Sequence, residues 1–295
     1  MDKVDKYRIL GLCDTDDTPV LEDGLINILI QSIASRRSLG VLEGLVEKIW
    51  EDKAAKVAAS GGHIFNGVQC AYLGHKRYDN DFVGLDLIMT DYAHYCAARA
   101  GVGQKVWLIG NAAIIVFRSP SGERQYVLGD RSTSVTNIGG KLEFPPAGFL
   151  DTQKENVFPM NEFVGGPTAY PCFDANILDE REEELGFPFE SPWSLPSAKT
   201  EVIESVGMFR LPLADHVNVS HVIEMHTSAE EVYETFRSCK ERSEAKGRTH
   251  ELAQLYVIPE SSLFDFLGAR KEELSPRVKG HLRQALMYSQ VMNRD

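Results

Sequence analysis

The sequence predicts an α+β protein in which a mixed β-sheet is packed between helices, with a smaller α/β extension at the N-terminus. In residues 101–295, strand-like runs come in pairs with helices between them, so they alternate less regularly than in a doubly wound sheet. The run VWLIGNAAIIVFR (106–118) is apolar throughout, which is typical of a strand buried on both faces. Residues 1–100 have a pattern of their own, so we expect them to form the extension and residues 101–295 the main domain.

The expected elements of the extension follow from hydrophobic spacing. A helix is predicted over 21–33, where Leu25, Ile28, Leu29 and Ile33 share one face at helical spacing. A second helix is predicted over 41–59, and the following pair of glycines ends it. The remaining expected elements are strands at 9–13, 63–73 and 82–89 and a short helix at 91–101.

The main domain begins with the buried strand at 106–118. RSPSGERQ then predicts a turn and YVLGDR (126–131) the returning strand, whereas KLEFPPAGFLD (141–151) predicts a short strand that enters a Pro/Gly turn. A long loop is expected over 151–171. The later expected elements are a helix at 173–185 ended by Gly186, strands at 200–211 and 217–227, a helix at 228–246 with Ser228 as N-cap and Glu231 three residues on, a strand at 252–259, and a helix from Ser275 to about 292.

Composition excludes several classes of protein. The chain has 295 residues and a formal net charge of −12. Such an acidic chain has no broad basic face for a phosphate backbone, so nucleic acid is not an expected partner. No apolar run approaches the roughly 18–20 residues of a membrane span, and the charged start is unlike a secretory signal. The 5 cysteines are widely spaced and contain no C-x-x-C, so we expect reduced thiols and a cytoplasmic location.

The acidity is concentrated in the predicted helix at 173–185. Residues 172–190 carry seven acidic side chains and one arginine, which is half of the net charge. At about 100° per residue, Glu180, Glu183 and Glu184 fall on one sector of the helix, whereas Glu182 points away. Carboxylates on one face repel each other, and in the last turns they also oppose the helix dipole. A solvated helix end is the plain alternative, but a bound divalent cation would relieve both penalties.

The segment LDEREEELGF resembles the signature helix of the Nudix hydrolase superfamily. In that pattern a Gly and then a Glu precede Arg-Glu-apolar-x-Glu-Glu-x-Gly-apolar. Aligned on Gly186, the glutamates of the pattern fall on Glu180, Glu183 and Glu184. The resemblance covers about residues 100–295, and residues 60–99 also resemble the N-terminal extension of some members.

The upstream half of the motif allows two alignments. With Gly148 as the first glycine, Glu155 is the matching glutamate, one residue late, and a long insertion follows. With Gly165 as the first glycine the spacing is regular, but the glutamate position holds Pro171. The strand-like LEF and the turn PPAG lead into Gly148 and favour the first alignment.

The resemblance implies metal-dependent hydrolysis of a nucleoside diphosphate linked to another moiety, with Mg²⁺ or Mn²⁺ between the acidic helix and the diphosphate. A nucleotide-derived small molecule is therefore the expected partner. The implied site consists of Glu180, Glu183 and Glu184 as metal ligands, Glu183 and Glu184 with Glu155 as catalytic residues, Glu155, Glu224 or Glu251 as general base, and Arg131 and Gly148 as substrate-binding residues. Arg131 suits a phosphate because of its guanidinium, and a structural salt bridge is its alternative role.

Two other functions stay open. Asp179 stands where the motif has arginine, and Arg181 stands where it has an apolar residue. These departures motivate a second hypothesis, a catalytically weak or inactive Nudix-like sensor that binds a nucleotide. A third hypothesis is an acidic interaction module whose helix binds a basic partner. The resemblance also implies a homodimer formed by extension of the sheet between protomers.

Overall fold

The computed structural model describes residues 19–21, 27–34, 43–59, 64, 66–79, 82–134, 139–150, 157–159, 169–171, 173–188, 202–211 and 215–282. The helices are α2 (Glu43–Ala59), α3 (Tyr92–Arg99), α4 (Phe173–Leu185), α5 (Ala229–Ala245) and α6 (Glu260–Ala269), followed by the 3₁₀ turn η2 (Lys271–Glu273) and a helical segment at 276–282. The strands are β1 (Pro19–Leu21), β2 (Asn27–Ala34), β3 (Val68–Asp79), β4 (Phe82–Asp91), β5 (Trp107–Arg118), β6 (Arg124–Arg131), β7 (Leu142–Glu143), β8 (Ala147–Phe149), β9 (Val157–Pro159), β10 (Ala169–Pro171), β11 (Val202–Leu211), β12 (His216–Met225) and β13 (Leu252–Pro259).

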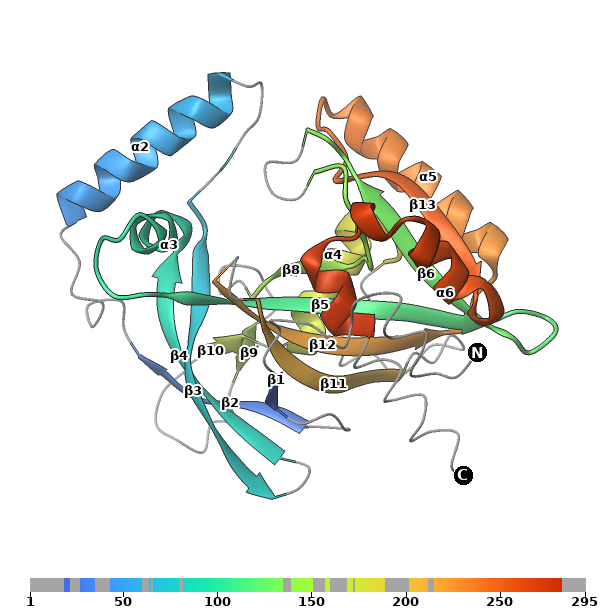
Figure 1. The fold of residues 1–295 in the computed structure, drawn as a ribbon, viewed down its shortest axis with the longest axis horizontal. Coiled ribbons are helices and arrows are strands. Elements are labelled where there is room, and N and C mark those ends of the chain that lie inside the picture. The colour runs from blue at the N-terminus through green and yellow to red at the C-terminus, as the bar shows by residue number, and fades with distance from the viewer. Residues whose placement is uncertain are drawn as a thin grey trace.

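One mixed sheet organises these strands. Its order is β1-β11-β12-β5-β3-β4-β2, and β6, β7, β8 and β13 are joined to it beside this path, whereas β9 and β10 pair separately. The long strand β5 connects the two halves (Figure 1). It pairs in parallel with β12 over most of its length and antiparallel with β6, which returns after a tight turn. All its residues between the two ends are buried, which confirms the prediction of a strand covered on both faces.

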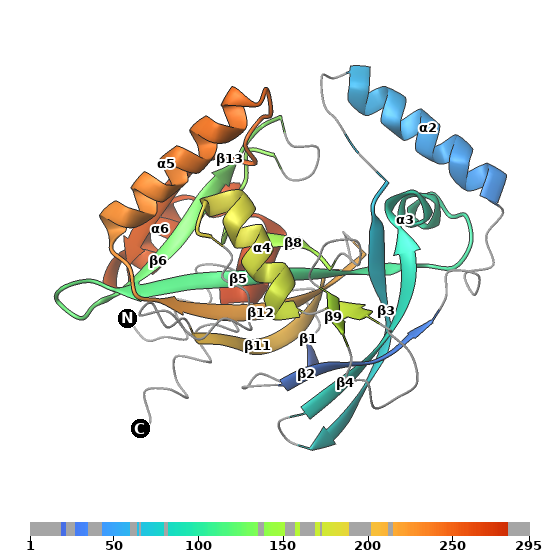
Figure 2. The same cartoon turned by 180° about the vertical axis from the view of Figure 1, so that it is seen from behind.

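Helices cover both faces of this sheet, as predicted. On one face, α4 and α5 pack through Ile177, Leu185 and Phe236 against Ile115 and Phe117 of β5. On the other face, α6 and the helical segment at 276–282 pack on β5, β6 and β12. The two views show this arrangement: α6 lies in front of the sheet in Figure 1, and α4 and α5 lie in front of it in Figure 2.

The predicted helix at 21–33 is wrong. The described part of this region holds β1 and β2, and β2 pairs in parallel with β4 from Asn27↔Phe82 to Ala34↔Ile88. Apolar residues at helical spacing in a short run are also compatible with a buried strand, and here pairing with β4 decides between the two. The strand expected at 9–13 lies outside the described residues. The predictions for α2, α3 and β4 are confirmed within about two residues at each end, whereas β3, expected at 63–73, begins five residues later and ends six residues later.

The strands before residue 100 belong to the same sheet as those after it. Cys70 and Leu85 of β3 and β4 share a buried cluster with Met208 and Val219 of β11 and β12. The sheet and this core cluster thus include residues from both parts of the chain, and the division into an extension, residues 1–100, and a main domain, residues 101–295, stays a prediction.

The C-terminal half follows the sequence, except that the stretch expected to be a long loop, 151–171, contains the paired strands β9 and β10. The side chain of Ser228 accepts a hydrogen bond from the backbone N–H of Glu231 and caps α5, as the capping pattern predicts. The helix expected after Ser275 is described from 276 to 282, and α6 is an element that the sequence did not predict. None of the helices in the described ranges is both long and apolar enough to span a membrane. The described cysteines, Cys70, Cys96 and Cys239, are buried free thiols.

Candidate functional site

The acidic helix α4 is held at both ends. At its start, Nδ2 of Asn111 in β5 donates hydrogen bonds to the Phe173 carbonyl, at 2.7 Å, and to Oδ1 of Asn176, at 3.2 Å. At its end, Gly186 adopts a left-handed φ of 83°, which ends the helix where the sequence predicts. A Cβ there would lie 2.7 Å from Cβ of Cys239, so glycine also permits the close approach of α5. These contacts fix the position of the carboxylates relative to the sheet.

Gly148 lies directly against Glu180. A Cβ at Gly148 would lie 2.3 Å from both Cδ and Oε1 of Glu180, so only glycine leaves room for this carboxylate beside β8. The alignment that begins the motif at Gly148 therefore brings its two halves into contact. Gly165, the alternative first glycine, and Glu155, the matching glutamate, lie outside the described residues.

Glu184 is the carboxylate of α4 with the most unusual environment. Its side chain is 3% exposed, and its Oε1 is buried with no hydrogen-bond partner among the described residues. Burial raises the pKa of Glu184 well above its usual range. The neighbouring carboxylates of Glu251, Glu180 and Glu143 raise it further, whereas Arg131 opposes them. A cation near Oε1 would compensate both the burial and the repulsion.

Arg131 lies at the centre of the buried acidic residues. Its Nη1 donates to Oε2 of Glu143 at 3.1 Å, and its Nη2 donates to Oε2 of Glu251 at 2.7 Å. Burial lowers the pKa of Arg131, but Glu143, Glu251 and Glu184 raise it above its ordinary value, so the guanidinium stays charged. The described contacts correspond to the salt-bridge role for Arg131, and contact with a substrate phosphate stays a prediction.

Glu143 is a site residue that the sequence reasoning did not identify. It is 2% exposed, and its Oε1 is buried without a hydrogen-bond partner in the described part of the chain. The signal for it was an acidic residue between Leu142 and Phe144, because both neighbours are apolar and a strand at that point was already predicted. The structure shows all three residues buried.

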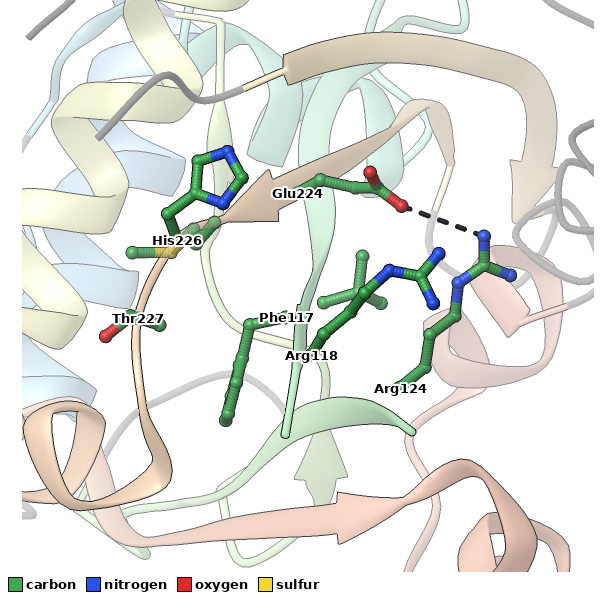
Figure 3. Close-up of a pocket in the computed structure, with 8 residues that line it drawn as sticks. Phe117, Arg118, Arg124, Glu224, His226 and Thr227 are labelled. Atoms are coloured by element: carbon green, nitrogen blue, oxygen red, sulfur yellow. Dashed lines mark ion pairs between the residues drawn. The ribbon is translucent and has the colours of Figure 1, made fainter. Parts of the chain in front are cut away.

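The other predicted site residues lie in two places, near the acidic helix and in a separate pocket. Glu183 is exposed on α4, and Glu251 is exposed at the start of β13, where it reaches Arg131. Glu224 lies elsewhere: it pairs with Arg124 at 3.7 Å and lines a pocket at the ends of β5 and β12 (Figure 3). The structure therefore brings Glu251 close to the acidic helix but not Glu224.

Arg181, which stands where the motif has an apolar residue, is accommodated in the packing of α4. Its side chain is 3% exposed, its Nη2 donates to the Pro188 carbonyl at 3.1 Å, and its guanidinium lies 6.0 Å from the ring centroid of Phe187. The alkyl part of an arginine packs like an apolar chain when the charged end finds an acceptor. The departure at Arg181 is therefore compatible with the packing of α4.

The carboxylates of the acidic cluster are the type of ligand that a divalent cation prefers, but they are not already arranged as a complete set of ligands. Across the described ranges, gaps excepted, no three His, Cys, Asp or Glu side chains are placed to hold a metal ion together. Mg²⁺ usually takes one or two carboxylates and completes its shell with water and substrate phosphate. The unpaired Oε1 of Glu184 next to Glu180 fits that mode of binding.

Comparisons with known proteins gave matches among solved structures. No family model and no curated protein matches the chain. Among solved structures, the chain is similar to the NUDIX domain of Shewanella oneidensis NrtR complexed with ADP ribose, with 15% identity over 69% of this chain and 99% of that chain and a TM-score of 0.36. It is also similar to a Nudix hydrolase from M. Smegmatis, RenU (12% identity, 64% and 92% covered, TM-score 0.32), and to a MutT/nudix family protein from Enterococcus faecalis (11% identity, 58% and 51% covered, TM-score 0.29). Because these TM-scores are below 0.5, a function has to be argued from the residues of this chain.

Proposed function

We propose that the protein is a metal-dependent pyrophosphohydrolase that cleaves a nucleoside diphosphate linked to another moiety. The observation that carries the proposal is the buried, unpaired Oε1 of Glu184 among the carboxylates of Glu180, Glu143 and Glu251. Keeping Glu184 charged at this buried position, among three other carboxylates and with Arg131 as the opposing charge, is unfavourable without a further cation. Such an arrangement of carboxylates is expected where a bound cation and a substrate phosphate supply the missing positive charge and the remaining contacts.

Each residue has a distinct role in this proposal. Glu180 and Glu184 hold the cation, and Gly148 leaves the space in which Glu180 lies. Glu183 is exposed on the same helix sector and faces solvent, where substrate and water arrive. A divalent ion bound there would polarise a phosphoryl oxygen and lower the pKa of a bound water.

Proton transfer is assigned to Glu251. Among the candidate bases in the described residues, it alone reaches the acidic cluster, and its side chain is 53% exposed, so it can receive a proton from water. Arg131 orients Glu251 through the contact at 2.7 Å. Arg131 is thus a positioning residue, and it holds Glu143 and Glu251 at a fixed separation.

The test is a hydrolysis assay with nucleotide sugars, dinucleotides and ADP-ribose, with and without Mg²⁺ or Mn²⁺. Release of nucleoside monophosphate is expected only with metal, and Glu183→Gln and Glu184→Gln should lower the rate at least about a hundredfold if they act in the transition state. Glu182→Gln is the matched control, because Glu182 lies on the opposite sector of the same helix. Equal rates in Glu184→Gln and the parent protein would reject the site.

A second function, nucleotide binding without turnover, is favoured by one observation. Asp179 replaces the arginine of the motif. Saturable nucleotide binding without product release would support this sensor. The absence of any thermal shift with Mg²⁺ or nucleotide would instead favour the acidic interaction module. The homodimer and the cytoplasmic location stay predictions.

A further inference from the structure

A second polar site lies at the opposite end of β6 from the acidic cluster. Its pocket is formed by the end of β5, the start of β6 and the end of β12, and it has a volume of about 210 Å³. The polar side chains on its wall are Arg118, Arg124, Glu224, His226 and Thr227. Arg124 and Arg131 are the two ends of β6, so at about 3.3 Å per residue the two sites are roughly 23 Å apart.

Arg124 has few hydrogen-bond partners for a buried arginine. It is 8% exposed, and its Nε is buried without a partner. Its guanidinium makes no hydrogen bond to any residue that the structure describes, and the nearest carboxylate oxygen, Oε1 of Glu224, is 3.7 Å away. A guanidinium carries five N–H donors, and buried arginines normally use most of them. The side chain therefore has donors for an acceptor in the pocket.

A second guanidinium stands beside the first. The side chains of Arg118 and Arg124 both point toward Glu224 (Figure 3). The exposed hairpin holds Arg118 in place, because its Nη1 donates to the Gly122 carbonyl at 3.2 Å. Both cationic side chains thus face the carboxylate of Glu224, which is 36% exposed, and Glu123 and Glu260 line the adjoining pocket beside the same two arginines.

We propose that Arg118 and Arg124 form a binding site for a phosphate group, either inorganic phosphate or a phosphate monoester. The guanidinium forks of the two arginines match the oxygens of a phosphate group in geometry and charge. A tetrahedral phosphate can accept from two guanidinium groups on different strands, because it presents more oxygens, in more directions, than the two coplanar oxygens of a carboxylate. The pocket is smaller than the usual 300–1,000 Å³ of drug-sized sites, so it suits a small anion.

The test measures phosphate binding to the full chain by isothermal titration in HEPES buffer, with sodium chloride at matched ionic strength as the blank. Arg124→Met should weaken inorganic phosphate binding about tenfold or more, since it removes charge-assisted hydrogen bonds. Arg237→Met is the matched control, because Arg237 is an exposed arginine of α5 and its loss changes the net charge equally. Glu224→Gln should tighten binding severalfold, because it removes the carboxylate that competes for Arg124.

Each outcome has a defined meaning. Binding of AMP that is at least as tight as that of inorganic phosphate, and that Arg124→Met weakens, identifies a monoester site, and binding of phosphate alone identifies a free-anion site. Equal binding of acetate and phosphate would overturn the proposal, as would equal losses in Arg124→Met and Arg237→Met. If Arg124→Met fails to fold, Arg118→Met and Glu224→Gln decide: the proposal requires opposite changes in affinity from these two variants. None of these results depends on whether the acidic cluster hydrolyses a substrate.

Discussion

The substitution Gly148→Ala tests the acidic cluster with a single methyl group. The added Cβ would lie 2.3 Å from Cδ and Oε1 of Glu180, whereas ordinary contact begins at 3.4 Å, so the carboxylate has to move by about 1 Å. The displaced atoms are the end of a flexible side chain. Gly148 does not have a left-handed φ, so alanine fits its backbone.

We expect Gly148→Ala to lose function while it keeps its stability. A misplacement of about 1 Å in a catalytic arrangement costs on the order of 10²-fold in rate. Alanine at a compatible glycine position stabilises by about 0.4–1 kcal/mol through the unfolded chain, which offsets the cost of moving Glu180. The assays are the metal-dependent hydrolysis rate, Mg²⁺ affinity by titration calorimetry, and the thermal unfolding temperature.

Two controls isolate the effect on Glu180. Gly74→Ala also adds a methyl group in a strand, but a Cβ at Gly74 meets nothing within 4 Å, so rate and stability should stay unchanged. In a Glu180→Ala background, Gly148→Ala should change the rate less than about twofold, because the carboxylate that it displaces is gone. An unchanged rate and Mg²⁺ affinity in Gly148→Ala would refute the reasoning, as would an equal loss in both backgrounds.

Three further predictions concern stability. Burial lowers the pKa of His221 and of His281 from 6.5 to about 3, so between these two pH values only the unfolded chain binds a proton at each histidine. The free energy of unfolding should therefore fall by about 1.4 kcal/mol per histidine as the pH is lowered from about 7.5 to about 5.5. A free energy of unfolding that does not change with pH in urea titrations would contradict this. Gly186→Ala forces a side chain into a φ of 83° and a Cβ to within 2.7 Å of Cβ of Cys239, and should cost roughly 2–4 kcal/mol; an unchanged urea midpoint would exclude that strain. Glu184→Gln should raise the melting temperature of the metal-free protein by about 1–2 °C, because about 1 kcal/mol of buried repulsion is removed. It should also abolish the shift produced by Mg²⁺, and an equal Mg²⁺ shift in variant and parent would speak against Glu184 as a ligand.

The acidic helix could be predicted because its information is local. Helical period, the glycine after Leu185 and the cluster of glutamates are all read within a short segment, and α4 has the predicted bounds. The different burial of Glu183 and Glu184 could not be predicted in this way. The groups around Glu184 include Arg131, Glu143 and Glu251, which are distant from it in sequence, and the burial of Glu143 beside Arg131 likewise depends on distant strands.

Strand partners were the main information that the sequence did not contain. The segment 21–33 looks helical by spacing, and only its pairing with β4 makes part of it a strand. Arg124 and Glu224 are likewise about a hundred residues apart, and they meet because β6 and β12 both pair with β5, at Val116↔Tyr126 and Glu224↔Val116. Pairing register is a property of the whole sheet, so a pocket built from three strand ends cannot be inferred from any one of them.

The parallel pairing of β12 with β5 also sets the order in which the protein can fold. Residues 216–225 join residues 108–117, so closing this pair requires a long loop, and folding dominated by such distant contacts is slow. During synthesis, β5 leaves the ribosome about a hundred residues before its central neighbour. Among the described strands, only β12 covers this edge of β5 over most of its length. Until β12 is made, the apolar edge of β5 is exposed, and exposed strands of this kind aggregate. Fragments that end before β12 should therefore be insoluble, even though they contain the complete acidic helix.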